Sequence, residues 1–278
     1  MELSEQAIAE VVATALREDV GSGDLTTGLL VPPAARCRAQ LLLEEPGVAC
    51  GIAVATAVFA ALDPDISLTP IRSDGARLET APTVLAELVG PAAAILTGER
   101  TALNLLGRLS GIATLTRRYV DQIAGTGATI LDTRKTTPGL RALEKYAVRC
   151  GGGHNHRFGL DDAILVKENH LRIAGGIAAA TATIAGHTRG IAVEVEAETI
   201  GQVAEALDAG IERILLDNMT PEQVAQAVEL TAGRAQLEAS GGITLGTIRA
   251  YAESGVDFIS VGGLTHAARS LHVSLELH

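Results

Sequence analysis

The chain has 278 residues, a length that suits either one large barrel or two domains of unequal size. Its net charge is −11 and only 2% of its residues are aromatic. Both features argue against nucleic acid as a partner, because nucleic-acid-binding proteins usually carry basic surfaces and stack bases on aromatic rings. Hydrophobic residues make up 47% of the chain, so small aliphatic side chains must fill the core, as is typical of helices packed on parallel strands.

The opening residues and the cysteines predict a soluble, cytoplasmic protein. The segment MELSEQAIAE has neither the basic nor the apolar region of a secretory signal. Apolar runs end well short of roughly 18 residues, the length of a membrane span, so no membrane partner is expected. Cys37, Cys50 and Cys150 form no CxxC pair and suit the reduced thiols of a cytosolic protein.

The first third of the chain has the pattern of a small α+β domain. Helical spacing of apolar residues predicts a helix over residues 4–18 with Ser4 as its N-cap, and a second helix is expected over residues 53–62. The pair Asp74-Gly75 is a hairpin signal. Short strands are expected over residues 38–43, 48–52, 66–71, 76–78 and 84–89.

A long helix is expected over residues 99–123, and beyond it strands and helices alternate. The strands are expected over residues 128–131, 163–166, 191–195, 214–216, 236–237 and 258–261. The helices that separate the later strands are expected over residues 176–184, 200–209, 221–230 and 245–254. The alternation predicts a parallel sheet. Nearly every strand ends in a charged residue or a glycine pair, and no GxGxxG turn is present, which favours a barrel of fewer than eight strands over an open sheet.

Basic residues gather within residues 100–172 of this otherwise acidic chain. Five of the candidate ligand-binding side chains follow predicted strands or a glycine run: Arg134, Lys135, His156, Arg157 and Lys167. Arginine pairs with planar carboxylates and lysine supplies a point charge, so the cluster predicts a small anionic ligand. Ordinary surface ion pairs are the alternative for any one of these residues alone.

The histidines of the segment His154-Asn155-His156 could also bind a metal ion. However, no cysteine or third histidine follows at the spacing of zinc ligands, so chelation is the less favoured interpretation.

Three carboxylates follow or end later strands. The alternation of VEVE puts Glu194 and Glu196 on one face of a strand, and Asp217 ends the next. These groups could hold Mg²⁺ through water, bind ribose hydroxyls or stabilise a cationic transition state. They could equally serve to neutralise nearby lysines.

The last two predicted strands run into glycine turns. Ser240, Gly241 and Gly242 follow one strand, and Gly262 and Gly263 follow the other. A pair of such turns, each leading into a helix, is typical of phosphate binding after the late strands of a barrel.

Long motifs in the chain resemble those of the quinolinate phosphoribosyltransferase family over nearly the whole sequence. They are ALREDVGSGDLTT, GERTALNLLGRLSGIATLT, DTRKTTPGLRALEKYAVRCGGGHNHRFGL, ILVKENH, VEVE, ILLDNM, ASGGI and VGGLTH. The resemblance implies transfer of a phosphoribosyl group from phosphoribosyl diphosphate to quinolinate, with decarboxylation, in NAD biosynthesis. It also implies an α/β fold: a small N-terminal sandwich domain and linking helix over residues 1–110, and an incomplete barrel of about seven strands over residues 111–278. The last residues could return to the first domain.

The resemblance also assigns roles to residues. Quinolinate would be bound by Arg134, His156, Arg157 and Lys167, together with Arg100 from the neighbouring subunit of a homodimer. Lys135 would face the diphosphate, and Glu196 and Asp217 would face the ribose hydroxyls and a hydrated Mg²⁺. The 5′-phosphate would be bound by Ser240, Gly241, Gly242, Gly262, Gly263 and His266. Lys135, Lys167, Glu196 and Asp217 would form the catalytic set.

One segment departs from the family pattern. Residues 79–82 are Glu-Thr-Ala-Pro where related chains have a glycine turn, which concerns a scaffold loop only.

The three alternative interpretations are a molybdenum-associated paralogous family, a nicotinate-specific relative and a non-catalytic barrel that binds sugar phosphates. Lys167 argues against the first, the number of bases against the second, and the combination of bases with carboxylates against the third.

Overall fold

The computed structural model describes residues 3–186 and 190–278. The chain divides into two compact units, and both are discontinuous. The first contains residues 1–117, 136–152 and 264–278, and the second contains residues 118–135 and 153–263. The predicted boundary at residue 110 divides the chain only once. In the structure the chain passes from one unit to the other four times, so residues 136–152 and 264–278 also belong to the first unit.

Two side-chain caps start the helices at the beginning of the first unit. Helix α1 (Glu5–Val20) begins after Ser4, whose hydroxyl accepts a hydrogen bond from the backbone N of Ala7 at 3.2 Å, so the predicted cap is confirmed. Helix α2 (Leu25–Leu30) begins after Asp24, whose carboxylate accepts from the backbone N of Thr27 at 2.9 Å. The sequence did not predict α2, because its short LTTGLL run lies among turn-forming residues.

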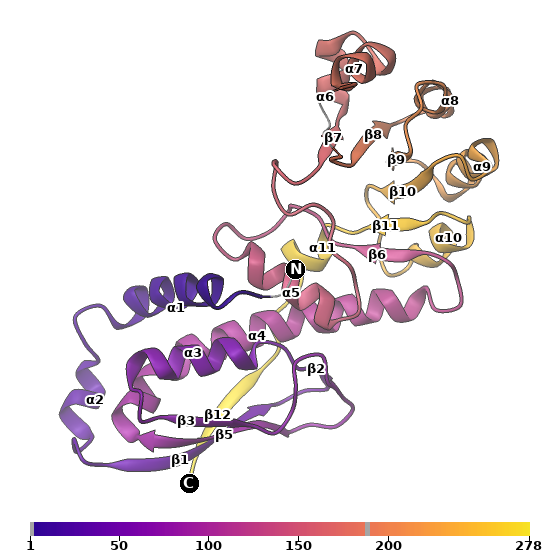
Figure 1. The fold of residues 1–278 in the computed structure, drawn as a ribbon. Helices are drawn as coiled ribbons and strands as arrows, with labels where there is room; N and C mark the ends of the chain where they lie inside the picture. The colour runs from indigo at the N-terminus through magenta and orange to yellow at the C-terminus, as the bar shows by residue number, and fades with distance from the viewer. Residues whose placement is uncertain (1–2, 187–189) are drawn as a thin grey trace. The chain divides into compact units, whose positions relative to one another are not determined.

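The first unit contains an antiparallel sheet with the strand order β12-β1-β5-β3. Its strands are β1 (Arg36–Leu43), β3 (Ser67–Pro70), β5 (Thr83–Pro91) and β12 (Val273–Leu277). Helix α3 (Ile52–Leu62), which buries Val58 and Phe59, lies along one face of this sheet (Figure 1). Because β12 pairs with β1, the last strand of the chain completes the first sheet.

The hairpin predicted at Asp74-Gly75 is wrong. Strand β4 (Arg77–Leu78) pairs with β2 (Gly47–Val48), whereas β3 pairs with β5. The carboxylate of Asp74 instead accepts hydrogen bonds from the backbone nitrogens of Gly51 and Ile52, both at 3.0 Å, and so caps α3. The strand expected over residues 48–52 is therefore cut short where α3 begins.

Two further helices complete the elements of this part of the chain. Helix α4 (Ala92–Gln122) follows β5 directly and starts earlier than predicted, since Ala92, Ala93 and Ala94 have high helix propensity. Helix α5 (Arg141–Cys150) lies in the basic segment, where no helix was predicted.

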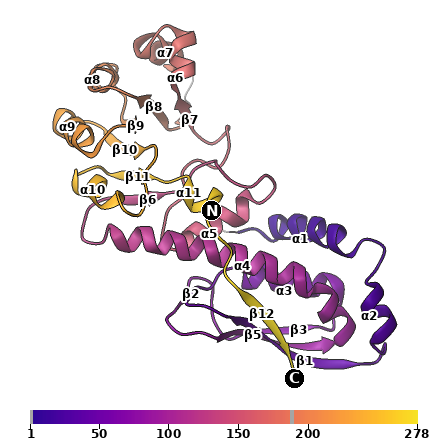
Figure 2. The same cartoon turned by 180° about the vertical axis from the view of Figure 1, so that it is seen from behind.

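The second unit is a parallel sheet of six strands in the order β6-β11-β10-β9-β8-β7. The strands are β6 (Thr129–Leu131), β7 (Ile164–Val166), β8 (Val193–Ala197), β9 (Arg213–Asp217), β10 (Gln236–Ser240) and β11 (Phe258–Ser260). Their connecting helices are α6 (Glu168–Ala174), α7 (Ile177–Ile184), α8 (Ile200–Asp208), α9 (Pro221–Thr231) and α10 (Ile248–Glu253). Helices α8, α9 and α10 lie in a row along one side of the strands, as both Figure 1 and Figure 2 show. The predicted α/β class and incomplete barrel are confirmed.

The sheet has one strand fewer than the expected number of about seven. In place of a further strand beside β6, His154 forms an isolated parallel bridge with Leu131. The backbone N of His154 donates to Ile130, and that of Asp132 donates to His154. The flanking glycines Gly151, Gly152 and Gly153 favour turns over an extended strand, which explains why the pairing stops at one residue.

Among the described residues, no helix combines the length and apolar character that a membrane span requires.

Replacing Asp74 with alanine is expected to destabilise the first unit. The substitution leaves two backbone N–H groups at the start of α3 without their acceptor, and it removes the hydrogen bond that the Tyr146 hydroxyl donates to Asp74 at 2.9 Å. We expect a loss of about 1–3 kcal/mol in the free energy of unfolding, measured by urea denaturation. The exposed Asp208→Ala variant is the control, and an equal effect of both substitutions would contradict the capping role.

Candidate active site

A cavity of about 300 Å³ lies among the residues that end the strands of the second unit. It is lined by Thr133, Arg134, Lys135, His156, Arg157, Leu165, Lys167, Glu196, Leu215, Asp217, Glu238, Ser240 and Ser260. Eight of the predicted site residues are therefore together: Arg134, Lys135, His156, Arg157, Lys167, Glu196, Asp217 and Ser240. They converge because parallel strands direct all their carboxyl ends to the same edge of the sheet.

The basic side of the cavity contains two arginines, Arg134 and Arg157. Arg157 donates from Nη1 to the carbonyl oxygen of Ala163 at 3.0 Å, which ties it to the residue before β7. Burial lowers the pKa of Arg157, and the positive charge of Arg134 lowers it further. Like charges held this close favour an anionic ligand, since an anion relieves their repulsion.

The acidic side of the cavity contains Glu196 and Asp217. Lys167 Nζ lies 3.3 Å from Glu196 Oε2, and the backbone N of Glu168 donates to Glu196 Oε1 at 3.2 Å. Burial raises the pKa of Asp217, and the nearby charge of Glu196 raises it further. A bound cation would remove this repulsion.

The ligand atoms of Glu196, Asp217 and Glu198 lie within 4.8 Å of one another, close enough to hold a metal ion. Carboxylate oxygens are the donors that Mg²⁺ prefers, so the residues present fit the predicted ion. Glu198 was not predicted, although the alternation of glutamates at residues 194 and 196 continues to it in the sequence.

His156 and Glu238, which line the cavity, belong to an ionic cluster with Glu194 and Arg213. The sequence predicted only His156 and Glu194 as site residues. Glu194 Oε2 lies 2.8 Å from His156 Nε2, and Arg213 binds both Glu194, at 3.0 Å, and Glu238, at 2.6 Å. Burial tends to raise the pKa of Glu194, but His156 and Arg213 hold it below its ordinary value. The pKa of Glu238 is raised by burial and then by Glu194. The signal for Arg213 was its alternation with Leu215 and Asp217 along β9.

Hydrogen bonds to the Asp132 side chain fix the start of the segment that carries His156. The buried carboxylate of Asp132 accepts from Asn155 Nδ2 at 2.5 Å and from the backbone N of His156 at 2.9 Å. His154 is exposed and takes part through its backbone bridge. The group of possible metal ligands that includes His156 contains Glu194 and Glu238 and does not contain His154.

The glycine turns follow β10 and β11, at the same edge of the sheet as the cavity. Gly241 and Gly242 have φ values of +99° and +61°, which glycine adopts at little cost. A Cβ on Gly241 would lie 2.9 Å from the backbone N of Asn218, so a side chain has no room there. Gly263 starts the short helix α11 (Gly263–His266). Arg100 and His266 belong to the first unit, and their roles remain predictions.

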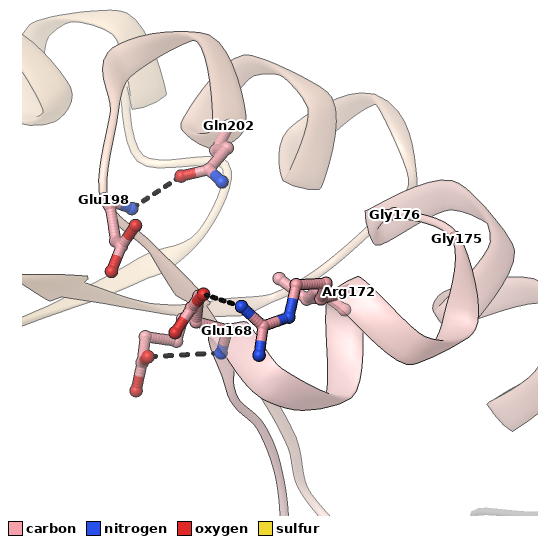
Figure 3. A pocket seen from close by; sticks show the side chains of 8 residues that line it. Glu168, Arg172, Gly175, Gly176, Glu198 and Gln202 are labelled. Carbon is pink, nitrogen blue, oxygen red and sulfur yellow. Dashed lines mark hydrogen bonds and ion pairs between the residues drawn. The ribbon is translucent and has the colours of Figure 1, made fainter.

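A second hollow shares Glu196 with the cavity and lies between α6 and α8. Figure 3 shows Arg172 directed towards Glu168, with Nη1 3.7 Å from the carboxylate, and Gln202 accepting from the backbone N of Glu198 at 2.7 Å. Three glutamates line it against one arginine. This hollow is therefore less suited to an anion than the cavity with Arg134 and Arg157.

Comparison with known proteins gives matches over nearly the whole chain. The quinolinate phosphoribosyl transferase N-terminal domain matches residues 24–110, and the C-terminal domain of the same family matches residues 112–276. A probable nicotinate-nucleotide pyrophosphorylase [carboxylating] of Bacillus subtilis is 45% identical over 263 residues, covering 94% of this chain and 90% of that protein.

Relatives from other organisms agree. Quinolinate phosphoribosyltransferase [decarboxylating] 1 of Nicotiana glauca is 39% identical, covering 96% of this chain and 81% of that protein. The structure of nicotinate-nucleotide pyrophosphorylase from Francisella tularensis superposes with a TM-score of 0.96 at 39% identity, covering 100% of this chain and 98% of that chain. The chain belongs to the quinolinate phosphoribosyltransferase family.

Proposed function

We propose that the protein transfers the phosphoribosyl group of 5-phosphoribosyl 1-diphosphate to quinolinate and forms nicotinate mononucleotide, CO₂ and diphosphate in NAD biosynthesis. The observation that carries this proposal is one cavity that is lined both by Arg134, Arg157 and Lys167 and by the carboxylates of Glu196 and Asp217. Such a cavity suits an anionic acceptor next to a reacting centre that becomes positive. The enzyme is a pentosyltransferase, as the names of its relatives indicate.

The acceptor is bound by the basic side of the cavity. Quinolinate carries two neighbouring carboxylates, and Arg134 and Arg157 offer planar guanidinium groups that pair with carboxylates through two hydrogen bonds. Lys167 adds a third positive charge, and His156 lies beside them in the lining. Nicotinate has one carboxylate and would leave part of this charge without a partner, so the number of bases favours the diacid.

The phosphoribosyl donor is bound by the side of the cavity opposite the acceptor. Ser240 and the turns at Gly241-Gly242 and Gly262-Gly263 offer backbone N–H groups that suit the 5′-phosphate. Lys135 binds the diphosphate and offsets the charge that grows on it as it leaves. Glu196 and Asp217 would hold Mg²⁺ through water, and the ion would supply further neutralisation of the diphosphate.

The reaction then proceeds without a covalent enzyme intermediate. The bond between ribose C1 and diphosphate breaks, and positive charge develops at C1, as in glycoside chemistry. Glu196 and Asp217 stabilise this charge, and the pyridine nitrogen attacks C1. When the C2 carboxylate leaves as CO₂, its bonding electron pair remains at C2, where the adjacent positive pyridinium nitrogen stabilises it. A proton from solvent then binds at C2.

The family resemblance and the cysteines bear on the assembly and location of the enzyme. We propose a homodimer in which Arg100 on α4 reaches the acceptor site of the neighbouring subunit, as the family resemblance implies. The three cysteines are free, which suits the reducing cytoplasm.

The purified protein is expected to form nicotinate mononucleotide and CO₂ from quinolinate, and no product from nicotinate. The assay contains phosphoribosyl diphosphate and Mg²⁺, and products are identified by chromatography and mass. Product from nicotinate at a comparable rate would contradict the acceptor assignment. A folded protein that binds phosphoribosyl diphosphate but turns over neither acid would support the non-catalytic barrel.

The variants Arg134→Ala and Lys167→Ala are expected to remain folded and to lose kcat/KM for quinolinate by about 100-fold or more, because each removes a charged hydrogen bond to the acceptor. Arg249→Ala is the control, since Arg249 pairs with Glu253 on α10 away from the cavity lining. Wild-type kcat/KM in either test variant would show that the acceptor binds elsewhere.

Removal of Mg²⁺ with a chelator is expected to abolish turnover, and added Mg²⁺ to restore it. Glu196→Gln is expected to raise the Mg²⁺ concentration that gives half-maximal activity, because it removes one anionic ligand next to Asp217. Steady-state rates across a Mg²⁺ titration measure this shift. An unchanged titration curve with Glu196→Gln would exclude Glu196 from the metal site.

A further inference from the structure

The interior of the barrel contains the charged side chains of Glu194, Arg213 and Glu238, although barrels of this kind are usually filled by branched aliphatic side chains. Arg213 is the first residue of β9, and the alternation of the strand puts it on the same face as Leu215 and Asp217, which line the cavity. Buried ions lose hydration energy, and apolar residues of similar size often give an equal or greater stability. The cluster therefore calls for an explanation other than stability.

Arg213 is held rigidly on three sides. Its Nε donates to Glu194 Oε1 at 3.0 Å, and its Nη2 donates to Glu238 Oε2 at 2.6 Å. The guanidinium also lies over the ring of Phe258, 4.6 Å from its centre. A metal ion between these carboxylates is not needed, because the guanidinium already occupies the cation's place between them.

The contacts of His156 fix the proton on its ring. Nδ1 accepts a hydrogen bond from the backbone N of Arg157 at 2.7 Å, so this nitrogen carries no proton. Nε2 lies 2.8 Å from Glu194 Oε2 and therefore donates to it. These two contacts place the ring proton on Nε2, and both ring nitrogens are bound within the protein.

We propose that Arg213 is a positioning residue for the acceptor site, acting through Glu194 and His156 on the backbone of Arg157. The proposal rests on the proposed function, since Arg157 is assigned to quinolinate there. Arg213 holds one oxygen of Glu194, the other oxygen holds the His156 ring, and the ring holds the N–H of Arg157. Each link is a hydrogen bond of 3.0 Å or less.

Substitution of Arg213 is expected to affect only the binding of the acceptor, quinolinate. The donor side of the cavity is formed by Lys135, Asp217 and Ser240, and none of the contacts in this chain of hydrogen bonds involves them. Disturbing Arg213 should therefore weaken quinolinate binding and leave donor binding almost unchanged.

The first test compares Arg213→Met with Arg213→Lys in the full-length protein. Arg213→Met keeps the length and apolar stem but removes the donors, so we expect KM for quinolinate to rise about tenfold and KM for phosphoribosyl diphosphate to change less than about twofold. Arg213→Lys restores one donor and should recover part of the loss. Arg249→Met is the matched control, as this arginine also pairs with a glutamate, but the pair lies on α10 and involves neither Glu194 nor Glu238.

Two kinetic outcomes would overturn the proposal. An unchanged KM for quinolinate in folded Arg213→Met would show that Arg213 does not act on the acceptor site. An equal rise in both KM values, with no recovery in Arg213→Lys, would show that Arg213 only supports the barrel.

The second test does not depend on turnover. Nitrogen NMR of wild-type protein with labelled histidine should show His156 with one protonated nitrogen, Nε2, and one bare nitrogen, Nδ1. The His156→Gln variant identifies the signals by their loss. A proton on Nδ1 in the wild type would overturn the proposal. Absence of quinolinate turnover in the wild type would instead contradict the proposed function, while this spectrum still tests the chain of contacts.

Discussion

The common direction of the six parallel strands determines what the second unit can bind. Because every strand ends at the same edge, side chains that are distant in sequence, such as Arg134, Lys167 and Asp217, line one cavity. Burial lowers the pKa of Arg157 and raises that of Asp217, and the like charges that the same constraint brings together shift each pKa further. A negative acceptor and a cation-bound diphosphate would each relieve the repulsion on one side of the cavity.

Many strands and helices could be predicted from the sequence because they follow from local patterns. The apolar runs before Lys167 and Asp217 and the alternating run that contains Glu196 predicted strands, and each is one. The strand-ending positions also identified most of the cavity lining. The hairpin at Asp74 failed for the opposite reason: the partner of β4 is β2, and a turn sequence does not reveal which strand a segment will pair with.

Arg213 and Glu238 escaped prediction because they lie below the ends of their strands. An arginine at the start of a strand usually suggests a solvent-exposed edge, and only the three-dimensional register places Glu238 opposite Leu215 and near Arg213. Side-chain caps such as Ser4 depend on a few adjacent residues and are visible in sequence, whereas a buried network joins residues of several strands and the loop that carries His156. That difference in sequence separation limits what a sequence can reveal about a site.

The exchange of segments between the two units has a consequence for synthesis of the chain. The second unit is built from residues 118–135 and 153–263, so all of its strands are synthesised before β12. The first sheet must wait, because Leu41 of β1 pairs with Leu275 of β12, almost at the end of the chain. One edge of β1 therefore stays unpaired while the rest of the protein is made, and an unpaired edge invites association with other chains. The first unit, although it is made first, is completed last.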